Sequence, residues 1–406
     1  MNTTGIIAEY NPFHNGHNYH LQQSKKISGA DYVIVVMSGN YVQRGEPAIV
    51  DKWTRTKMAL QNGADIVIEL PSIYASSSAE NFSHSAVSLL NATGIVSSIC
   101  FGSETADMDL MKEIAKVLCD EPDEYKTILK SELSKGLVFP KARANALKSY
   151  TKKNTSFIDS PNNILAIEYI KALNRLGSTI VPYTIKREIA EYHSTDISSH
   201  ISSATAIRFN LKNDNINAIS NVIPKESMIS FLDCIDNGIG PVYFDDFSTL
   251  LNYRLRTLSA EELANILDIT EGIENRILNA SHTYFNISDI ANFVKTKRYT
   301  YTKIQRALLH ILLDFKKSDI KDYSNSVPYI RVLGFRKQSE SLLSNLCKKA
   351  TVPVITNTKK VKTLLSPVGL KMFNQECRST DIYFLNNRNV LQRTANREYT
   401  TPIIIY

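Results

Sequence analysis

Three histidines lie close together in the stretch TGIIAEYNPFHNGHNYHL, which covers residues 4–21. His14 and His17 are three positions apart, so on a helix both side chains reach the same face of the first turn. Their ring nitrogens can donate hydrogen bonds to phosphate oxygens, which helps most where negative charge builds up during attack at an α-phosphate. Gly16 leaves room for a base or a phosphate beside the backbone. This spacing predicts a cradle for nucleotidyl transfer.

A metal site is one alternative for these histidines, and a local structural role is another. A metal ion needs further ligands in a suitable geometry, and no carboxylate stands here in His-Glu-x-x-His spacing. We therefore expect no metal at this place. The third histidine, His20, is compatible with a wall of the site and with a structural position in the helix.

The elements that must position the histidines follow the pattern of a Rossmann-like doubly wound parallel sheet, in an α/β fold. Ligands of such sheets bind beyond the carboxyl ends of the strands, where the strand order reverses. A helix that begins near Asn15 points its free amides and the positive end of its dipole at that place, which favours phosphate. The expected strands, each rich in β-branched residues, lie at residues 4–10, 31–38, 65–71, 97–103 and 178–186.

The chain of 406 residues exceeds the usual size of one domain. We expect a nucleotidyltransferase-like, ATP-binding catalytic domain at residues 1–215, with a helical insertion at about 108–155. A mainly helical C-terminal region should follow at 216–406, because apolar residues recur there at three and four spacing. The first two helices are predicted at residues 15–29 and 51–62, and short strands are expected at 352–357 and 401–406.

Composition sets limits on the class of protein. Hydrophobic residues make up 43% of the chain and charged residues 21%, and no apolar run is long enough for a membrane helix. The N-terminus does not resemble a secretory signal, and the five cysteines form no Cys-x-x-Cys pair. These features predict a cytoplasmic protein with reduced cysteines and no membrane partner.

The charge is formally +7, which is compatible with a polyanionic partner without requiring one. Basic residues gather in KTKRYTYTKIQR, from Lys295 to Arg306. Such a run is either a solvated helix face or a contact with nucleic acid.

The tetrad of residues 14–17 resembles the HxGH signature of the nucleotidyltransferase superfamily. Further segments resemble the bacterial tRNA(Met) cytidine acetate ligase family, and together they cover nearly the whole chain. These segments are EYNPFHNGH from Glu9, VMSGNYVQRGEPAIVDKWTRTKMAL from Val36, DIVIELP from Asp65, FGSE from Phe101, SPNNILAIEYIKAL from Ser160, SSATAIR from Ser202, KRYTYTKIQRALLHILL from Lys297 and YIRVLGF from Tyr329.

The resemblance implies a ligase that uses ATP and acetate to form acetyl-adenylate and pyrophosphate. The acetyl group would then pass to the wobble cytidine of elongator tRNA(Met), giving N4-acetylcytidine. Mg²⁺ would accompany the triphosphate without a protein cage of its own. Adenylyl transfer follows from the residues themselves, whereas acetate, the tRNA and the wobble base come from the family alone.

The resemblance also implies the residues of the ATP site, with His14 and His17 as phosphate-facing donors. Of two adjacent asparagines at 162 and 163, we favour the first as a nucleotide contact, beside Gly102 and Arg187. The implied ATP loop comprises Ile7, Ala8, Glu9, Tyr10, Asn11, Pro12, Phe13, His14, Asn15, Gly16, His17, Asn18, Tyr19 and His20.

ISSATAIR resembles the second signature of the superfamily, a serine-rich turn before an arginine at a helix start. Ser202 and Ser203 would offer hydroxyls and amides to the leaving phosphates, and Arg208 would offer a fork of donors. The chain lacks a lysine-rich Lys-Met-Ser-Lys-Ser loop, so the resemblance does not identify the side chain that neutralises pyrophosphate. With the family in view, the basic run is expected to contact tRNA through Lys297, Arg298, Lys303 and Arg306.

The segment SGNYVQRGEPAIVDKWTR, from Ser38, leaves the expected second strand at the same edge of the sheet. We interpret it as a wall of the site, in which Arg44 or Lys52 holds acetate or a nucleic-acid phosphate. Trp53, the single tryptophan, is expected to anchor a helix in the core.

Two other functions remain as alternatives. The first is a small-molecule nucleotidyltransferase that acts on a phosphorylated metabolite, although it has no evident need for the long basic C-terminal region. The second is a non-catalytic RNA-binding protein, which the intact His14, Gly16, His17 and Arg208 disfavour.

Overall fold

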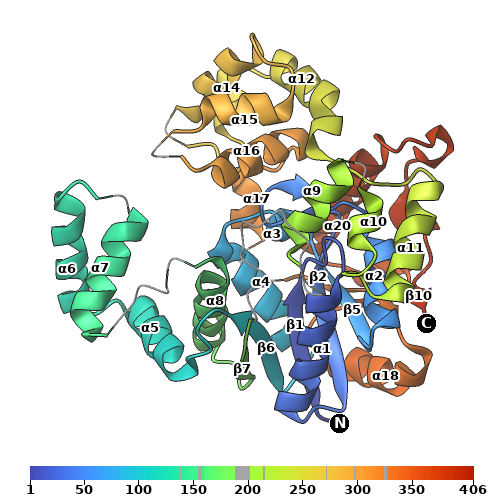
Figure 1. Ribbon diagram of the computed structural model, residues 1–406, viewed down its shortest axis with the longest axis horizontal. Coiled ribbons are helices and arrows are strands. Elements are labelled where there is room, and N and C mark those ends of the chain that lie inside the picture. Colours follow the sequence, from blue (N-terminus) through green and yellow to red (C-terminus); the bar gives the residue numbers. More distant parts are fainter. Residues whose placement is uncertain are drawn as a thin grey trace.

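A mainly parallel sheet forms the centre of the molecule (Figure 1). The computed structural model describes the chain except for residues 138, 154–157, 159, 188–201, 214, 271, 297–298 and 324–326. The sheet runs in the order β10-β8-β5-β2-β1-β6-β7, with β9 beside β8. Its strands are β1 (Thr3–Ala8), β2 (Tyr32–Ser38), β5 (Ile66–Leu70), β6 (Ser98–Ser103), β7 (Val181–Lys186), β8 (Ile330–Phe335), β9 (Val354–Ile355) and β10 (Ile404–Ile405).

The strands β5, β2, β1, β6 and β7 are mutually parallel. The chain first winds outward from β1 through β2 to β5, and then returns to the other side of β1 with β6 and β7. This reversal places the switch point of the sheet between β1 and β6, where ligands of doubly wound sheets bind. The predicted α/β fold of Rossmann type is confirmed.

The side chains of β2 point alternately to the two faces of the sheet and are buried on both. Val33, Val35 and Met37 pack in the cluster that includes the helices α1 (Asn15–Ser28) and α2 (Lys52–Gln61). Ile34 and Val36 belong to the opposite cluster, with α4 (Ala79–Ala92) and α8 (Pro161–Arg175). Burial of each such side chain contributes about 1.5–3 kcal/mol, so a slip of one residue, which exchanges the two faces, is strongly disfavoured.

The first two helices begin and end where the sequence predicted. His14 is the N-cap of α1, and Gly29 ends the helix with a φ of 60°, a left-handed conformation that suits glycine. The second helix has Asp51 as its N-cap, and its backbone amides at 53 and 54 donate to the Asp51 carboxylate. Trp53 on this helix is buried against the ring of Phe384, so the expected core position is confirmed.

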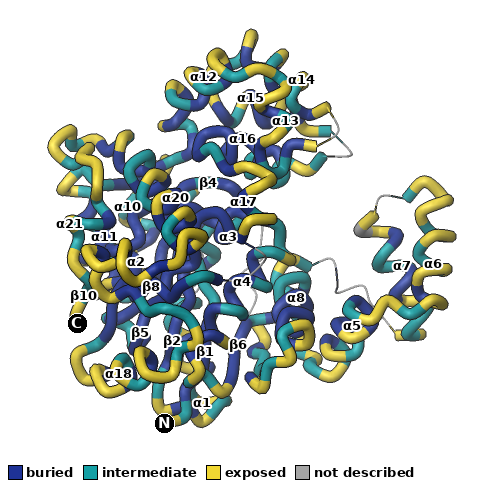
Figure 2. The backbone as a smooth tube through the Cα atoms, turned by 180° about the vertical axis from the view of Figure 1, so that it is seen from behind, coloured by how far each residue is buried: buried dark blue, intermediate teal, exposed yellow. Residues whose placement is uncertain are grey.

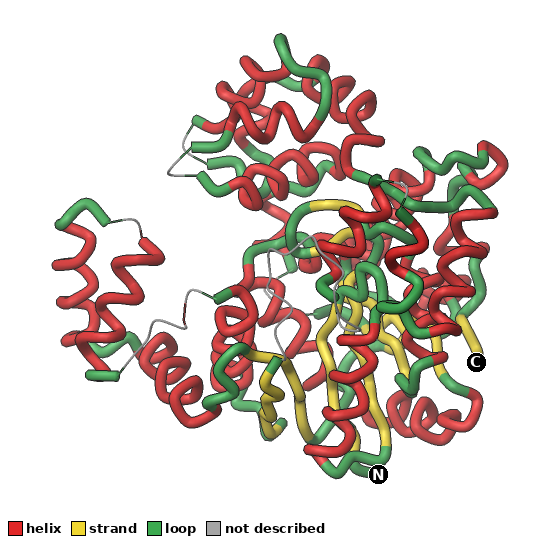
Figure 3. Tube along the Cα trace, viewed as in Figure 1, coloured by secondary structure: helices red, strands yellow, loops and turns green. Residues whose placement is uncertain are grey.

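Two helical regions extend from the sheet domain. The insertion contains α5 (Met108–Asp120), α6 (Asp123–Ser134) and α7 (Phe139–Thr151), which project to one side (Figure 1) and show much exposed surface on α6 and α7 (Figure 2). The described residues of a second lobe form helices and loops (Figure 3). Its main helices are α12 (Ser248–Thr257), α13 (Ala260–Ala264), α14 (Ile273–Ser281), α15 (Ile287–Val294) and α16 (Tyr301–Leu313).

The remaining helices connect these regions or cover the sheet. None of the helices among the described residues is both long and apolar enough to cross a bilayer. The remaining helices are α3 (Ser72–Ala75), α9 (Ala204–Lys212), α10 (Ile216–Ile219), α11 (Lys225–Asp236), α17 (Lys317–Asp322), α18 (Glu340–Lys349), α19 (Val361–Leu364), α20 (Pro367–Phe384) and α21 (Arg397–Thr400). A short hairpin pairs β3 (Tyr41–Val42) with β4 (Glu46–Pro47).

The C-terminal part of the chain returns to the central sheet. Strand β8 pairs antiparallel with β5, and all six of its residues are buried. The short strands β9 and β10 pair with β8 and lie within the two tail segments where strands were expected. The sheet therefore draws on residues from both sides of the boundary expected near residue 215.

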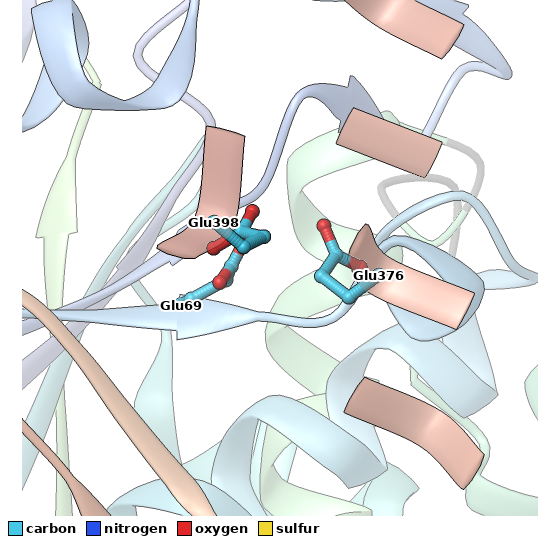
Figure 4. Close-up of side chains that lie close together, drawn as sticks. All are labelled: Glu69, Glu376 and Glu398. Carbon is cyan, nitrogen blue, oxygen red and sulfur yellow. The ribbon is translucent and has the colours of Figure 1, made fainter. Parts of the chain in front are cut away.

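A buried ionic cluster ties this C-terminal part to the sheet. The carboxylates of Glu69 from β5, Glu376 from α20 and Glu398 from α21 converge (Figure 4). The ammonium group of Lys52 lies among them, in ion pairs with Glu69 and Glu398 and 3.6 Å from Glu376. The side chain of Lys52 is fully buried. The expectation that Lys52 holds acetate or a phosphate is therefore wrong, because three carboxylates already neutralise its charge.

Candidate nucleotide-binding site

A cavity of about 460 Å³ lies at the switch point, between the residues that follow β1 and those that follow β6. Most of the residues that the sequence proposed for the ATP site line this cavity. They are Ile7, Ala8, Glu9, His14, Gly16, His17, Tyr19, His20, Gly102, Asn162, Arg187, Ser203 and Arg208.

Other residues of the implied ATP loop do not line the cavity but hold the loop in place. Tyr10 and Phe13 are fully buried and pack edge to face at 4.7 Å between ring centroids. The side-chain oxygen of Asn11 accepts a hydrogen bond from the Ile49 amide at 2.7 Å. Pro12, Asn15 and Asn18 are also absent from the described cavity wall. These residues therefore support the residues of the loop that line the cavity.

The two histidines of the tetrad are held by their own backbone. The Nδ1 atom of His14 accepts from the Gly16 amide at 3.1 Å, and Nδ1 of His17 accepts from the His14 amide at 3.3 Å. The rings stack at 3.7 Å between centroids. Because each Nδ1 is an acceptor, the neutral ring carries its hydrogen on Nε2. Each ring therefore carries one N–H donor, as a phosphate cradle requires.

These histidines are neutral at physiological pH. Burial, together with the charges of Arg187 and Arg208, lowers the pKa of His14 to about 3. Burial and Arg187 lower the pKa of His20 to about 4. Burial, followed by the neighbouring His14, keeps the pKa of His17 well below its ordinary value. The site therefore offers hydrogen-bond donors to phosphate without changing charge near pH 7.

The buried histidines predict how the stability of the protein depends on pH. The pKa values of His14 and His20 fall from 6.5 to about 3 and about 4. As pH falls from 6.5 towards 4, these histidines are protonated in the unfolded chain but stay neutral in the folded protein. The difference favours the unfolded state and so lowers the stability of the protein. The free energy of unfolding should drop over this window, as measured by urea denaturation. The drop should be smaller in a His14→Asn/His20→Asn variant, and an equal drop would contradict the assignment.

Three residues of the wall meet where β6 and β7 end. The Arg187 guanidinium donates to the Asn162 side-chain oxygen at 3.2 Å. A Cβ atom on Gly102 would lie 3.0 Å from Cγ of Arg187, so glycine permits this close approach. Asn162 also donates to Glu104 at 2.7 Å. The structure thus brings Gly102, Asn162 and Arg187 together on one side of the cavity.

The neighbouring Asn163 has a different position. It is fully buried, and its side-chain oxygen accepts from the Glu104 amide at 3.0 Å. The backbone N–H of Asn163 in turn donates to the Glu104 carboxylate at 3.0 Å. Asn163 therefore fastens the loop after β6 to the start of α8, whereas Asn162 faces the cavity.

A second helix start faces the cavity from the serine-rich turn. Ser203 is the N-cap of α9, and its hydroxyl accepts from the Ala206 amide at 3.1 Å. The hydroxyl of Ser202 is buried and has no hydrogen-bond partner among the described residues. Arg208 donates to the Asn11 carbonyl at 2.9 Å and lies 3.1 Å from the Glu46 carboxylate. The starts of α1 and α9 thus both face this space. The Asn15 and Gly16 amides of α1 already donate, to the Val222 carbonyl and to Nδ1 of His14, so α1 contributes the positive end of its dipole, which favours a polyphosphate.

The loop after β2 closes the cavity, as its interpretation as a wall predicted. Gln43 and Arg44 line the space, and the Gln43 amide donates to the Glu9 carboxylate at 2.9 Å. The preceding Ser38 and Gly39 are buried and lie outside the lining.

The residues expected to contact tRNA are placed in part. Lys297 and Arg298 lie outside the described residues. Lys303, in the first turn of α16, donates to the Thr270 hydroxyl at 3.0 Å and lies 5.1 Å from the centre of the Tyr299 ring. Arg306 forms an ion pair with Asp268 at 2.9 Å. The guanidinium of Arg306 therefore has a structural partner in the helical lobe.

Sequence reasoning missed the apolar part of the cavity wall. Phe82 of α4 and Leu165 and Tyr169 of α8 line the cavity. Asn162, Leu165 and Tyr169 are three and four residues apart, so they share one face of α8. This spacing was the available signal, but the same spacing also marks an ordinary core face.

The fold, the histidine loop and the two facing helix starts define a nucleotide-binding protein of the HxGH class. A family model described as HIGH Nucleotidyl Transferase matches residues 1–398. A protein from Acetivibrio thermocellus named tRNA(Met) cytidine acetate ligase is 44% identical over 414 residues, covering 100% of both chains. A protein of the same name from Caldanaerobacter subterraneus subsp. tengcongensis is also 44% identical, over 406 residues and 100% of both chains. The chain belongs to the tRNA(Met) cytidine acetate ligase family, as the sequence motifs predicted.

Solved structures agree with this placement. The crystal structure of Thermotoga maritima TmcAL bound with alpha-thio ATP has a TM-score of 0.94 and 33% identity, covering 100% of this chain and 99% of that one. The apo form of the same protein has a TM-score of 0.95 and 34% identity at the same coverage.

Proposed function

We propose that this protein is an ATP-dependent ligase that activates acetate as acetyl-adenylate and transfers the acetyl group to the wobble cytidine of elongator tRNA(Met). The full-length identity to relatives of that name supports the proposal. The observation that carries it is the pair of neutral Nε2–H donors beside two helix starts, at the switch point of the sheet. Such a site binds and stabilises a reacting triphosphate.

In the first step, an oxygen of acetate attacks the α-phosphorus, and the bond from that phosphorus to the bridging oxygen of pyrophosphate breaks. His14, His17 and the positive dipole ends of α1 and α9 stabilise the charge that develops on phosphate oxygens. Arg208 and Arg44, which is in the loop after β2, both line the cavity and supply positive charge. Mg²⁺ would accompany ATP and would help to neutralise the departing pyrophosphate. Alignment and charge stabilisation provide most of the rate enhancement.

The second step requires the cytidine to leave the anticodon stack and enter the same cavity. The exocyclic N4 amine attacks the acetyl carbonyl, and AMP leaves. We place the reaction in the cytoplasm, where tRNA and ATP are present together.

A pyrophosphate exchange assay tests the proposal. Protein, ATP, Mg²⁺ and labelled pyrophosphate should transfer label into ATP when acetate is present, with or without added tRNA. Addition of tRNA(Met) should then yield N4-acetylcytidine, detected by mass spectrometry of digested RNA. Label exchange that does not depend on acetate would instead favour a nucleotidyltransferase that acts on a phosphorylated metabolite. If no label is exchanged when both acetate and total tRNA are present, the proposed ligase activity is refuted.

The helical lobe is proposed to bind the anticodon arm through its basic residues. Lys303→Ala should weaken tRNA binding and reduce the slope of log affinity against log salt by about one. Lys348→Ala on α18 is a matched control, because α18 and α16 lie at opposite ends of the molecule (Figure 1). Filter binding at several salt concentrations measures both variants. An equal effect of the two substitutions would show that Lys303 makes no specific contact.

A further inference from the structure

The acetyl-transfer step needs a group that accepts the proton of the attacking amine, and the cavity wall contains few candidates. The cytosine N4 lone pair is delocalised into the ring, so the nitrogen becomes a good nucleophile only as its proton leaves. His14 and His17 are poor acceptors, since each Nδ1 already accepts an amide hydrogen and each Nε2 carries its own. His20 also lines the cavity, and its Nε2 has no partner among the described residues, but burial and Arg187 lower its pKa to about 4, which makes it a weak base. Tyr169 stays protonated, because burial raises the pKa of its hydroxyl.

Two carboxylates remain among the described residues that line the cavity, Glu9 and Glu104. Both oxygens of Glu104 are in use, accepting from the Asn162 side chain at 2.7 Å and the Asn163 amide at 3.0 Å. Glu9 uses one oxygen, which accepts from the Gln43 amide at 2.9 Å. Its other oxygen has no hydrogen-bond partner in the described part of the chain. Glu9 is thus the carboxylate with free acceptor capacity in the cavity.

Glu9 is also held in a fixed position, in the loop that carries the two histidines. It directly follows β1, five residues before His14 in the same loop. Its carbonyl oxygen accepts from the Arg55 guanidinium at 2.8 Å, and Arg55 also donates to the Ser38 carbonyl at 2.9 Å. These bonds fix the backbone of Glu9 to the end of β2. The carboxylate therefore has a defined position on the wall.

We infer that the Glu9 carboxylate accepts a hydrogen bond from the cytosine N4 amine and takes its proton during acetyl transfer, an inference that rests on the proposed function. The nitrogen forms a bond to the acetyl carbonyl carbon, and the bond from that carbon to the phosphate oxygen breaks. AMP leaves with the electron pair, and the proton moves to Glu9, which later releases it to water. A glutamate acceptor also suits cytosine, whose N4 is a donor, and disfavours uracil, whose O4 is an acceptor.

The electrostatic surroundings suit a base that works near neutral pH. Burial raises the pKa of the Glu9 carboxyl above its ordinary value, and the nearby Glu46 raises it further. The Gln43 amide and the charges of Arg44 and Arg208 favour the ionised carboxylate and partly offset this rise in pKa. A base whose pKa lies closer to the working pH is a more effective proton acceptor.

The substitution Glu9→Gln separates this role from the first step. Glutamine keeps the size of the side chain and an oxygen for the Gln43 amide, but it cannot take a proton. Two rates should be measured in the full chain: acetate-dependent pyrophosphate exchange, and single-turnover acetyl transfer to tRNA(Met). The ratio of transfer to exchange should fall by about 10²- to 10⁴-fold in the variant, the usual contribution of a general base. The rise of the wild-type transfer rate with pH should also disappear.

Glu104→Gln serves as the matched control, because it removes a carboxylate from the same cavity wall. It should keep the pH dependence of transfer, whatever it does to ATP affinity. Equal loss of exchange and transfer in Glu9→Gln would assign Glu9 to adenylation and overturn the inference, as would an unchanged pH profile. Absence of acetate-dependent exchange in the wild-type protein would instead refute the proposed function itself.

Discussion

Replacement of His17 by alanine should reduce acetate-dependent pyrophosphate exchange by about 10²- to 10³-fold, the usual cost of one donor that faces developing charge. The loss has a definite physical cause. The Nε2–H of His17 is aimed by the bond that Nδ1 accepts from the His14 amide at 3.3 Å. Alanine removes the donor and leaves that amide without its partner. The initial rate of label exchange into ATP measures the effect.

His17→Asn is the control for this prediction, because asparagine retains a donor and an acceptor on a shorter side chain. It should recover part of the lost rate. The alanine variant also loses one half of the capping box at the start of α1, which costs about 0.5–2 kcal/mol of stability. Thermal unfolding distinguishes a folded, inactive variant from an unfolded one. If folded His17→Ala exchanges label as fast as the wild type, His17 is not part of the cradle.

The central sheet was predictable because its strands and helices follow local rules. The segments around Ile34, Ile66 and Ile99 are short β-rich runs that alternate with helices, and Gly29 ends the first helix as expected. Strand β8 was not predicted as a part of this sheet. Its segment YIRVLGF is as β-rich as the others, but it follows a long helical region and pairs antiparallel with β5. Pairing between segments so distant in sequence is set by tertiary packing, which no local pattern encodes.

The candidate site was predictable where one short segment carries the chemistry. His14, Gly16 and His17 lie within a single turn, so spacing alone places them together. Tyr169 and Phe82 come from separate helices, and their meeting depends on how α4 and α8 pack. Lys52 shows the converse error. A lysine after a polar loop suggests a free cation, but three glutamates from distant parts of the chain surround it.

Replacement of Lys52 by methionine should destabilise the protein by about 3–5 kcal/mol, the usual cost of removing one partner from a buried ion pair. Burial by itself would lower the pKa of Lys52, but Glu398, Glu69 and Glu376 raise it above its ordinary value, so the ammonium stays charged. Methionine fills a similar volume but leaves three buried carboxylates facing one another. Arg331 forms an ion pair with Glu398 at 3.8 Å and so offsets the charge of one of the three carboxylates. Urea denaturation at pH 7 measures the loss.

The pH dependence of this loss identifies its electrostatic origin. Burial raises and Lys52 lowers the pKa of Glu69 and of Glu398, so removal of Lys52 should leave both pKa values above those of the unfolded chain. Groups with a raised pKa add stability at low pH that disappears as pH rises. The difference between wild type and variant should therefore shrink as pH falls from 7 towards 5. Lys153→Met, which removes an exposed partner of Glu113, should change stability little at any pH. A loss that stays constant with pH would mean that lost packing, rather than unpaired charge, destabilises the variant.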